Sequence, residues 1–261
     1  MPEDPAQQPP RYPDLAGKSA VVTGGSRGIG AATARALAAN GTTVAVVGRD
    51  DDALAAVTDD IQARGGRALA VRADCTVEAD VVRAAHTVID QLGPPDILAA
   101  FAGGSGIPIP AANETAAHWR EVIDSNLTAT FLTISSFLAA MIERQHGSIV
   151  TMSSAAARQA AHSNAAYAAA KAGLIAFTRH LANEIAPHGV RVNCLAPSAI
   201  ENDRMRTAMT EQQRQQLAAS FPLGRIGQPD DVGAATLFLA SDASSWITGI
   251  TLDIAGGKIM L

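Results

Sequence analysis

The chain has 261 residues, of which 48% are hydrophobic and 17% are charged, and its formal net charge is −5. This much apolar material excludes intrinsic disorder and is enough for the core of one large α/β domain. The charge balance, with no basic block, disfavours a nucleic-acid partner. No run of apolar residues approaches the roughly 18 that a membrane span requires, so no membrane partner is expected.

The N-terminal residues differ in composition from the rest of the chain. Residues 1–14 are rich in Pro and Gln and lack the apolar centre of a signal peptide. We expect a disordered tail over 1–14 and a single domain over 15–261. The two cysteines, Cys75 and Cys194, show neither metal-ligand nor redox spacing, so we expect both to be reduced. These features predict a cytoplasmic protein.

From residue 19 onward, short β-branched runs alternate with Ala- and Leu-rich segments, which is typical of βαβ units. Strands that are apolar on both faces suit a sheet covered by helices on both sides. The pattern predicts an α/β fold, a single Rossmann-like, doubly wound parallel sheet of about seven strands. Strands are predicted at 19–23, 43–47, 68–72, 96–100, 148–152, 191–195 and 250–252, and helices at 29–39, 51–63, 78–91, 114–142, 164–185 and 230–240.

A polar segment, 198–222, interrupts this alternation after a predicted strand end. Ligands of open α/β sheets bind beyond the carboxyl ends of the strands, so this position predicts a substrate lid. A solvated helical hairpin without a gating role is the alternative.

The first predicted strand leads directly into a glycine-rich turn, 23–30, and then into a helix. Glycines there permit a tight turn and close approach of the backbone, while the helix N-terminus offers N–H groups and a positive dipole end to a pyrophosphate. The spacing differs from the usual G-x-G-x-x-G. The predicted cofactor contacts in this turn are Gly24, Ser26, Arg27, Gly28, Ile29 and Gly30.

The end of the second predicted strand bears on the choice of cofactor. In dinucleotide folds an acidic residue there holds the ribose 2′-hydroxyl of NAD, whereas an arginine accommodates the 2′-phosphate of NADP. The acidic position reads Gly48 here, and Arg49 follows, with Arg27 as a second cation. The acidic run 50–52 is explained by helix capping. We therefore expect NADP(H) in preference to NAD(H), which stays possible.

Tyr167 and Lys171 are four residues apart in a predicted helix, so they share one helix face. A nearby ammonium favours the phenolate, which makes a tyrosine usable as a general acid and base. Ser153 and Ser154 follow the predicted strand 148–152, where a hydroxyl can bind a carbonyl oxygen as negative charge develops. Taken singly, these features also fit an exposed helix face and a turn.

Three elements together resemble the short-chain dehydrogenase/reductase family: Thr23-Gly24-x-x-x-Gly28-x-Gly30, the separation of Ser154 from Tyr167, and Tyr167-x-x-x-Lys171. The resemblance extends from residue 15 to the C-terminus. Within it, 221–257 is similar to 3-oxoacyl-carrier-protein reductases. It implies an NADPH-dependent carbonyl reductase that transfers hydride reversibly to a ketone or 3-oxoacyl substrate, without a metal.

The resemblance also implies roles for matching residues. Tyr167 would exchange a proton with the substrate oxygen, and Ser154 would polarise the carbonyl. Lys171 would bind the nicotinamide ribose and depress the pKa of Tyr167, and Asn126 would hold a water of the proton relay. The remaining implied cofactor contacts are Asp74 and Cys75 near the adenine, Ala100, Ala102 and Gly103 after the fourth strand, and Pro197, Ile200 and Asn202 near the nicotinamide.

The chain departs from the family pattern at three places. The usual Asn-Asn-Ala-Gly reads Ala100-Phe101-Ala102-Gly103, the usual Pro-Gly reads Pro197-Ser198, and Asn202 replaces a threonine. Segment 143–148 carries a single arginine beside a glutamate, which leaves recognition of a carrier protein open. His162 is a further candidate for facing the substrate. An NAD-dependent secondary-alcohol or diol dehydrogenase and a non-catalytic dinucleotide-binding protein are the alternatives.

The expected partners are a small-molecule carbonyl or alcohol substrate and further copies of the chain. The resemblance implies a homotetramer, or a dimer, formed through the helices 114–142 and 164–185. The C-terminal region would close a second interface.

Overall fold

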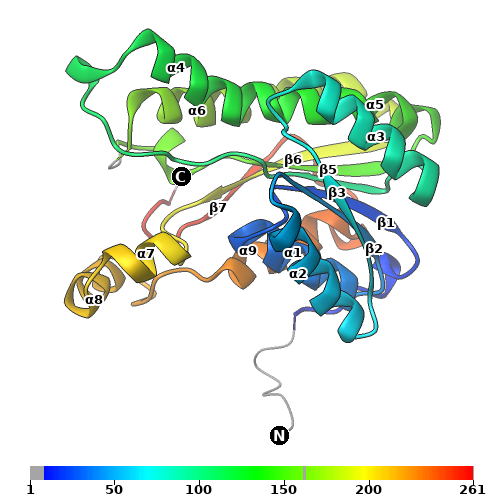
Figure 1. Cartoon of the computed structure of the whole chain (residues 1–261), viewed down its shortest axis with the longest axis horizontal. Coiled ribbons are helices and arrows are strands. Elements are labelled where there is room, and N and C mark those ends of the chain that lie inside the picture. The colour runs from blue at the N-terminus through cyan, green and yellow to red at the C-terminus, as the bar shows by residue number, and fades with distance from the viewer. Residues whose placement is uncertain (1–8, 161–162, 261) are drawn as a thin grey trace, which may run out of the picture.

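The structure, a computed structural model, describes residues 9–160 and 163–260. It confirms the predicted fold class, because the chain forms one seven-stranded sheet in the order β3-β2-β1-β4-β5-β6-β7 in which every neighbouring pair is parallel (Figure 1). The strands are β1 Ser19–Thr23, β2 Thr43–Gly48, β3 Arg67–Arg72, β4 Ile97–Ala100, β5 Gly147–Met152, β6 Val190–Pro197 and β7 Thr251–Ile254.

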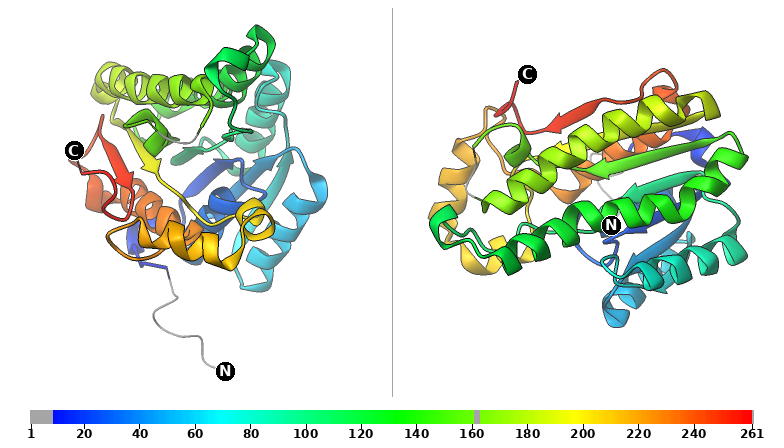
Figure 2. Two further views of the ribbon diagram at one scale, coloured as in Figure 1. Left: turned by 90° about the vertical axis from the view of Figure 1, so that its left-hand side faces the viewer. Right: turned by 90° about the horizontal axis from the view of Figure 1, so that it is seen from above.

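Helices cover both faces of this sheet. In Figure 1 the helices α1, α2 and α9 lie below it, and α3 to α6 lie above it. Figure 2 shows α5 and α6 side by side across the strands. The helices are α1 Gly28–Ala39, α2 Asp51–Ala63, α3 Glu78–Leu92, α4 Ala116–Ile123, α5 Ala129–Glu143, α6 Ala165–Ile185, α7 Asp203–Ala208, α8 Glu211–Ala219 and α9 Pro229–Ala240.

Each face of the sheet has its own apolar core. Along β1, Ala20 and Val22 belong to the core under α1, α2 and α9, whereas Val21 belongs to the core under α3, α5 and α6. Side chains alternate between the faces of a strand, so a strand buried on both sides must be apolar at every position. This is why the predicted strands read as continuous apolar runs, and their ends agree with the structure to within two residues.

The predicted helix 114–142 is not continuous. A π-helical turn, Asp124–Thr128, separates α4 from α5. Within it the side-chain amide of Asn126 donates to the carbonyl of Val122 at 2.9 Å, the acceptor that the backbone N–H would use in an α-helix. The side chain thereby competes with the regular ladder, which helical periodicity does not reveal.

The helical stretch Ala116–Glu143 has 28 residues and a mean hydropathy of 1.4, so it is long and apolar enough to cross a membrane by length and composition. The absence of an unbroken apolar run of about 18 residues did not predict this stretch. In the fold its inner face packs on the sheet, where Ile134, Phe137 and Met141 are buried in the core. It is one of the helices that cover the sheet.

Residues 9–14, which the sequence analysis assigned to a disordered tail, instead contact the domain. The backbone N–H of Tyr12 donates to the side chain of Asn40 at 2.8 Å. Asp14 accepts from Lys18 at 3.2 Å and from the backbone N–H of Asp242 at 3.0 Å. Asn40 and Asp242 lie far along the chain from this segment, so its composition alone could not indicate these contacts.

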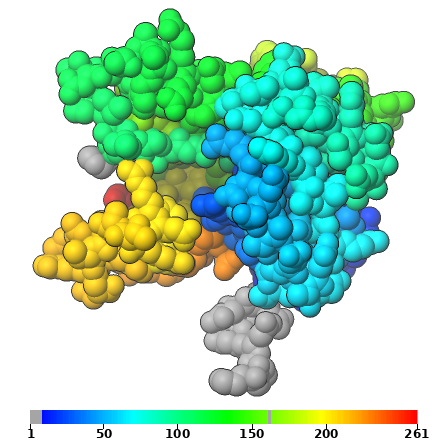
Figure 3. Space-filling view, in the orientation of Figure 1, coloured from blue at the N-terminus to red at the C-terminus, as the bar shows by residue number. Residues whose placement is uncertain are grey.

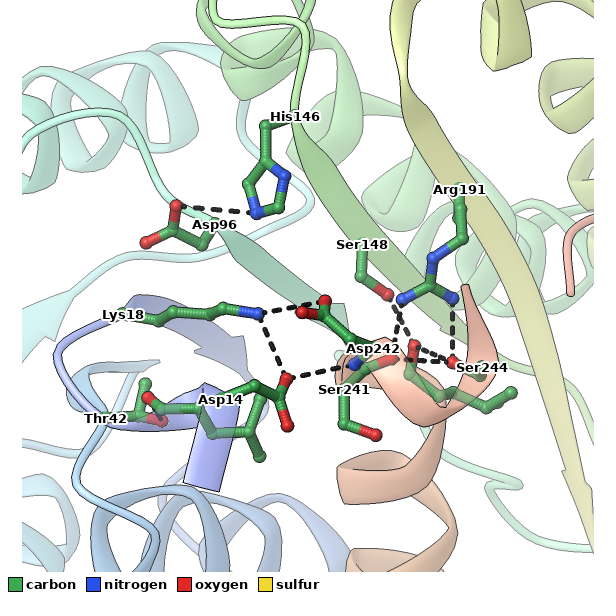
Figure 4. A network of polar contacts seen from close by, with 12 residues as sticks. Asp14, Lys18, Thr42, Asp96, His146, Ser148, Arg191, Ser241, Asp242 and Ser244 are labelled. Atoms are coloured by element: carbon green, nitrogen blue, oxygen red, sulfur yellow. Dashed lines mark hydrogen bonds and ion pairs between the residues drawn. The ribbon is translucent and has the colours of Figure 1, made fainter. Parts of the chain in front are cut away.

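The contacts of Asp14 belong to a polar network at the amino-terminal edge of the sheet (Figure 4). Lys18 lies between the carboxylates of Asp14 and Asp242, at 3.2 and 3.4 Å. Arg191 donates to the hydroxyl of Ser244 at 2.9 Å and to the carbonyl of Ser241 at 3.2 Å. The network ties β1 and β6 to the segment that leads into β7.

Replacement of Leu98 by Ala tests the core. Leu98 is fully buried in β4, so the variant should lose about 2–5 kcal/mol of unfolding free energy through lost burial and the residual cavity. Urea titration followed by circular dichroism measures the loss. Leu223→Ala is the control, because Leu223 is 69% exposed and should change stability by less than about 0.5 kcal/mol. Equal losses in the two variants would contradict the assigned core.

Candidate active site

The glycine-rich turn lies between β1 and α1, at the carboxyl edge of the sheet. Gly24 and Gly28 adopt φ values of +65° and +50°, a region that L side chains rarely occupy. A Cβ on Gly30 would lie 2.1 Å from the carbonyl oxygen of Gly24, so only glycine fits there. Within the described part of the chain, a Cβ on Gly28 would meet no atom within 4 Å, and no side chain caps the N-terminus of α1. A backbone cradle facing free helix N–H groups fits a pyrophosphate.

Thr23 fastens this turn to the end of β4. Its hydroxyl oxygen accepts from the backbone N–H groups of Phe101 and Ala102 at 3.1 and 3.2 Å. The ring of Phe101 is buried in the core under α1. The segment that replaces the family's Asn-Asn-Ala-Gly is therefore held through its backbone, and the small Ala102-Gly103 pair is retained beside the turn.

Cations gather at the carboxyl ends of β2 and β3, where the adenosine ribose is expected. Arg27 forms an ion pair with Asp50, and the guanidinium of Arg49 lies 3.6 Å from the carboxylate of Asp74. Both arginines are exposed. Ser26 lies beside the end of β2, because its hydroxyl oxygen is 3.3 Å from the position of a Cβ on Gly48.

A third arginine, which was not among the predicted cofactor contacts, also lies here. Arg72 ends β3, where it pairs in register with Gly48 of β2, and its guanidinium lies 3.6 Å from Asp51. The register of the two parallel strands, together with the adjacent strand ends, was the signal that could have identified it.

Asp74 and Cys75 differ in what they present to the site. Although burial opposes it, hydrogen bonds from Thr76 and the charge of Arg49 hold the pKa of Asp74 below its ordinary value. The carboxylate therefore stays ionised. The thiol of Cys75 is buried in the core under α3, and burial raises its pKa to about 11. Of this pair, Asp74 alone offers a polar side chain to the adenosine region.

The structure brings Ser154, Tyr167 and Lys171 together. Ser154 follows β5, and Tyr167 and Lys171 lie one turn apart on α6. The Lys171 ammonium nitrogen is 5.5 Å from the centre of the Tyr167 ring and donates to the carbonyl of Met152 at 2.8 Å. The hydroxyl of Ser153 donates in return to the carbonyl of Lys171 at 2.7 Å. These reciprocal bonds clamp the end of β5 to α6.

Burial dominates the electrostatics of this group. It raises the pKa of Tyr167, an effect that a hydrogen bond with Ser154 partly offsets. It lowers the pKa of Lys171 from 10.5 to about 8, although the neighbouring Cys194 acts in the opposite direction. The net direction for the Tyr167 pKa is upward, because burial outweighs the hydrogen bond with Ser154. The depression of this pKa by Lys171, which the resemblance implied, stays a prediction.

Asn126 is fully buried and holds the loop after β4. Its amide nitrogen donates to the carbonyl of Gly104, and its carbonyl oxygen accepts from the N–H of Gly104, both at 3.1 Å. A Cβ on Gly103 would lie 2.6 Å from this oxygen. The side chain thus fixes the position of the 103–104 backbone beside the site.

Asn164 has a structural role that sequence reasoning missed. Its side-chain oxygen caps α6 by accepting from the N–H of Tyr167 at 2.7 Å. Its amide nitrogen donates to the carbonyls of Ser105 and Ile107 at 3.0 and 3.3 Å. An asparagine three residues before the tyrosine is the helix-start signal that could have identified this bridge.

The three residues predicted near the nicotinamide follow one another at the end of β6. Pro197 is the last residue of the strand, and Ile200 is buried in the same core as Phe101. Asn202 caps α7, because its oxygen accepts from the N–H of Met205 at 3.0 Å while its nitrogen donates to the carbonyl of Ile200 at 3.2 Å. Its amide is therefore engaged within its own segment.

The 198–222 segment contains the two short helices α7 and α8. Glu201 anchors it, since its carboxylate accepts from Arg214 and from Gln228, both at 2.7 Å. Arg204 reaches the loop after β4 and donates to the carbonyl of Gly106 at 2.7 Å. Figure 3 shows a hollow between this yellow segment and the green helical layer above it. His162 lies outside the described residues.

Known proteins resemble this chain over nearly its whole length. The family model described as enoyl-(acyl carrier protein) reductase matches residues 24–258. The 3-oxoacyl-(acyl-carrier-protein) reductase FabG of Escherichia coli (strain K12) is 37% identical over 250 residues, which cover 94% of this chain and 98% of the relative. The corresponding reductase of a Synechocystis strain is 39% identical over 249 residues, with the same coverage of both chains.

Solved structures agree with these relatives. A 3-oxoacyl-(acyl-carrier protein) reductase of Brucella melitensis with bound NAD superposes with a TM-score of 0.86 at 33% identity, covering 96% of this chain and 94% of that one. A short-chain type dehydrogenase/reductase of Mycobacterium marinum superposes with a TM-score of 0.89 at 33% identity, covering 96% and 98%.

The lowered pKa of Lys171 predicts how stability depends on pH. Between pH 8 and about 10 the folded protein loses the Lys171 proton while the unfolded chain, with its ordinary pKa of 10.5, keeps it. The unfolding free energy contributed by Lys171 should therefore rise with pH in this window, by up to about 1.4 kcal/mol per unit. Urea titrations of wild type and Lys171→Met at pH 7, 8, 9 and 9.5 measure it. The same pH dependence in both proteins would contradict the burial of the ammonium.

Proposed function

The chain belongs to the short-chain dehydrogenase/reductase family, and we propose that it reduces the ketone of 3-oxoacyl thioesters with NADPH. As a member of the family it is an oxidoreductase that interconverts C=O and CH–OH groups. The observation that carries the proposal is the grouping of Ser154, Tyr167 and Lys171 beside the glycine-rich turn, at one edge of the sheet. The relatives named above as 3-oxoacyl-(acyl-carrier-protein) reductases support the substrate class.

The residues of the chain that would hold the cofactor form a continuous track. The turn from Gly24 to Gly30 and the start of α1 would bind the pyrophosphate, and Asp74 would contact the adenine. Arg27 and Arg49 would bind the 2′-phosphate, because a guanidinium suits the geometry and charge of phosphate. The backbone of 100–103 and residues 197–202 would flank the nicotinamide. When bound, the cofactor supplies the hydride for reduction.

Proton transfer would be the task of Tyr167. Because burial raises its pKa above the ordinary 10.0, the phenol is protonated at neutral pH and ready to act as an acid toward a carbonyl oxygen. Ser154 would donate a hydrogen bond to the same oxygen. The Lys171 ammonium, 5.5 Å from the ring, would stabilise the phenolate that remains. Asn126 would position the adjoining backbone and a water of the relay.

The position of the 198–222 segment supports its role as a substrate lid over a domain that spans 15–261. It lies at the carboxyl edge of the sheet and borders the hollow in Figure 3. Glu201 and its partners Arg214 and Gln228 would act as the anchor about which the segment closes.

A second candidate, NAD-dependent oxidation of a secondary alcohol or diol, is favoured by one observation. The cations that would bind a 2′-phosphate are each paired with a carboxylate, Arg27 with Asp50 and Arg49 with Asp74. These pairs partly neutralise the positive charge, which weakens discrimination against NAD. The structure of a relative with bound NAD is consistent with this alternative.

We further infer that the chain forms a homotetramer or a dimer in the cytoplasm. Phe131 on α5 is half exposed and packs edge-to-face on Phe177 of α6, with ring centres 6.3 Å apart, so an aromatic surface crosses both helices. Trp246, which precedes the edge strand β7, is 99% exposed and offers a large apolar side chain at a second place on the surface. Such surfaces favour self-association. Both cysteines are free and buried, which suits a reducing compartment.

Replacement of Tyr167 by Phe tests the proton-transfer role. The variant should lose at least about a hundredfold in kcat for an acetoacetyl thioester, because the general acid is gone. Its affinity for NADPH, measured by the quenching of protein fluorescence, should stay close to that of wild type. Tyr12→Phe, at the other tyrosine of the chain, is the matched control and should retain activity. Near wild-type turnover by Tyr167→Phe would refute the assignment.

Replacement of Arg49 by Gln tests the cofactor preference. The kcat/KM for NADPH should fall about tenfold, and that for NADH should change little, because the lost contact is a charged hydrogen bond to the 2′-phosphate. Arg83→Gln removes a similarly exposed arginine from α3 and is the control. Equal turnover of wild type with NADPH and NADH, unaffected by Arg49→Gln, would favour the NAD-dependent alternative.

A further inference from the structure

We propose that Arg204 selects substrates that carry an anionic group, a phosphate or a carboxylate, on the part of the molecule remote from the ketone. The inference rests on the proposed function and concerns the same cleft, for which it names a charge requirement and the side chain that meets it.

Arg204 lies on α7 and bridges the two sides of the cleft. Its guanidinium donates to the carbonyl of Gly106, 2.7 Å away in the loop after β4. Asn164 holds that loop through the neighbouring carbonyls of Ser105 and Ile107, and the same side chain caps α6 at Tyr167. Arg204 is thus separated from the N-terminal turn of the Tyr167 helix by one loop and one side chain.

Among the residues that the structure describes, no neighbouring carboxylate neutralises the charge of Arg204. Of the other two arginines in the 198–222 segment, Arg214 lies 2.7 Å from Glu201, and Arg206 lies 3.5 Å from Glu201 and 3.8 Å from Asp203. Within 9–160 and 163–260, no carboxylate lies within 4.0 Å of the Arg204 guanidinium. The side chain is exposed and its one polar partner is an uncharged carbonyl.

An exposed guanidinium without a carboxylate partner can bind an anionic ligand without first breaking an ion pair. It presents five N–H donors, one of which is used by Gly106, and its planar fork matches the oxygens of a carboxylate or a phosphate. A ketone held at Ser154 and Tyr167 would extend its substituent through the hollow between the two sides of the cleft (Figure 3). The anionic group would therefore sit on the tail of the substrate, beyond the loop that Asn164 holds.

Two acetoacetyl thioesters separate this charge requirement from the chemistry of the ketone. Acetoacetyl-CoA has a phosphorylated tail, and acetoacetyl-N-acetylcysteamine has the same reacting group on a neutral tail. Arg204→Gln should raise KM for the CoA thioester about tenfold and change KM for the neutral thioester less than about twofold, with kcat for both retained. Arg204→Lys should restore part of the difference.

The control is Arg206→Gln, which removes a paired cation from the same helix and should leave the preference for acetoacetyl-CoA intact. A half-ester of a 3-oxo dicarboxylic acid, compared with its diester, forms the carboxylate arm. If Arg204→Gln raises KM tenfold for the half-ester alone, the natural substrate has a carboxylate tail. If it raises KM for acetoacetyl-CoA alone, the tail is phosphorylated.

Equal losses for charged and neutral substrates would overturn the proposal, because Arg204 would then serve only to hold the loop. Binding of CoA itself, measured by calorimetry with NADP⁺ saturating, keeps the test independent of turnover. Arg204→Gln should weaken that binding about tenfold if phosphates reach the guanidinium. Failure of wild type to reduce either thioester would contradict the proposed function. If Arg204→Gln changes neither the binding of CoA nor KM for the half-ester, the role of Arg204 is contradicted.

Discussion

The site depends on the clamp between the end of β5 and α6. The buried Lys171 ammonium donates to Met152, and Ser153 donates to the Lys171 carbonyl, so strand and helix are joined in both directions. Burial of the Lys171 ammonium costs free energy of hydration, which its hydrogen bond to one carbonyl does not fully replace. The pKa of Lys171 is lowered to about 8 for this reason. The same bonds bring Ser154 and Tyr167 into contact. The position of the Tyr167 hydroxyl is therefore determined partly by buried groups, the Lys171 ammonium and the Ser153 hydroxyl.

Much of this arrangement follows from the sequence. Strands that are apolar at every position, such as 19–23, require helices on both sides, and parallel connections then place every strand end on one edge. Thr23-Gly24, Ser154 and the Tyr167–Lys171 pair all lie at or near strand ends or on the following helix. Proximity of these groups thus follows from topology, which periodicity and glycine spacing predict well.

What the sequence did not predict depends on contacts between side chains and distant backbone. The π-helical turn arises because Asn126 bonds to Val122 and Gly104, and no local preference signals it. The link from Arg204 to Gly106 joins residues 98 positions apart. The carboxylate partners of Arg27 and Arg49 likewise come from other segments of the chain. These contacts depend on the three-dimensional path of the loops, which residue patterns do not encode. The capping of α7 by Asn202 is local, and an asparagine at a helix start is the signal that could have identified it.

The polar network at the amino-terminal edge has a consequence for how such a protein can change over generations. This network holds the strand ends that lie opposite the candidate active site, through Lys18, Asp14, Asp242 and Arg191. The loops that border the cleft lie at the opposite edge of the sheet. A few hydrogen bonds hold them there, such as those of Glu201 and Asn164. Insertions and replacements in those loops leave the register of the sheet untouched. The residues that maintain the sheet are therefore different from the residues that border the cleft. Substrate specificity can change by small steps while the fold is kept.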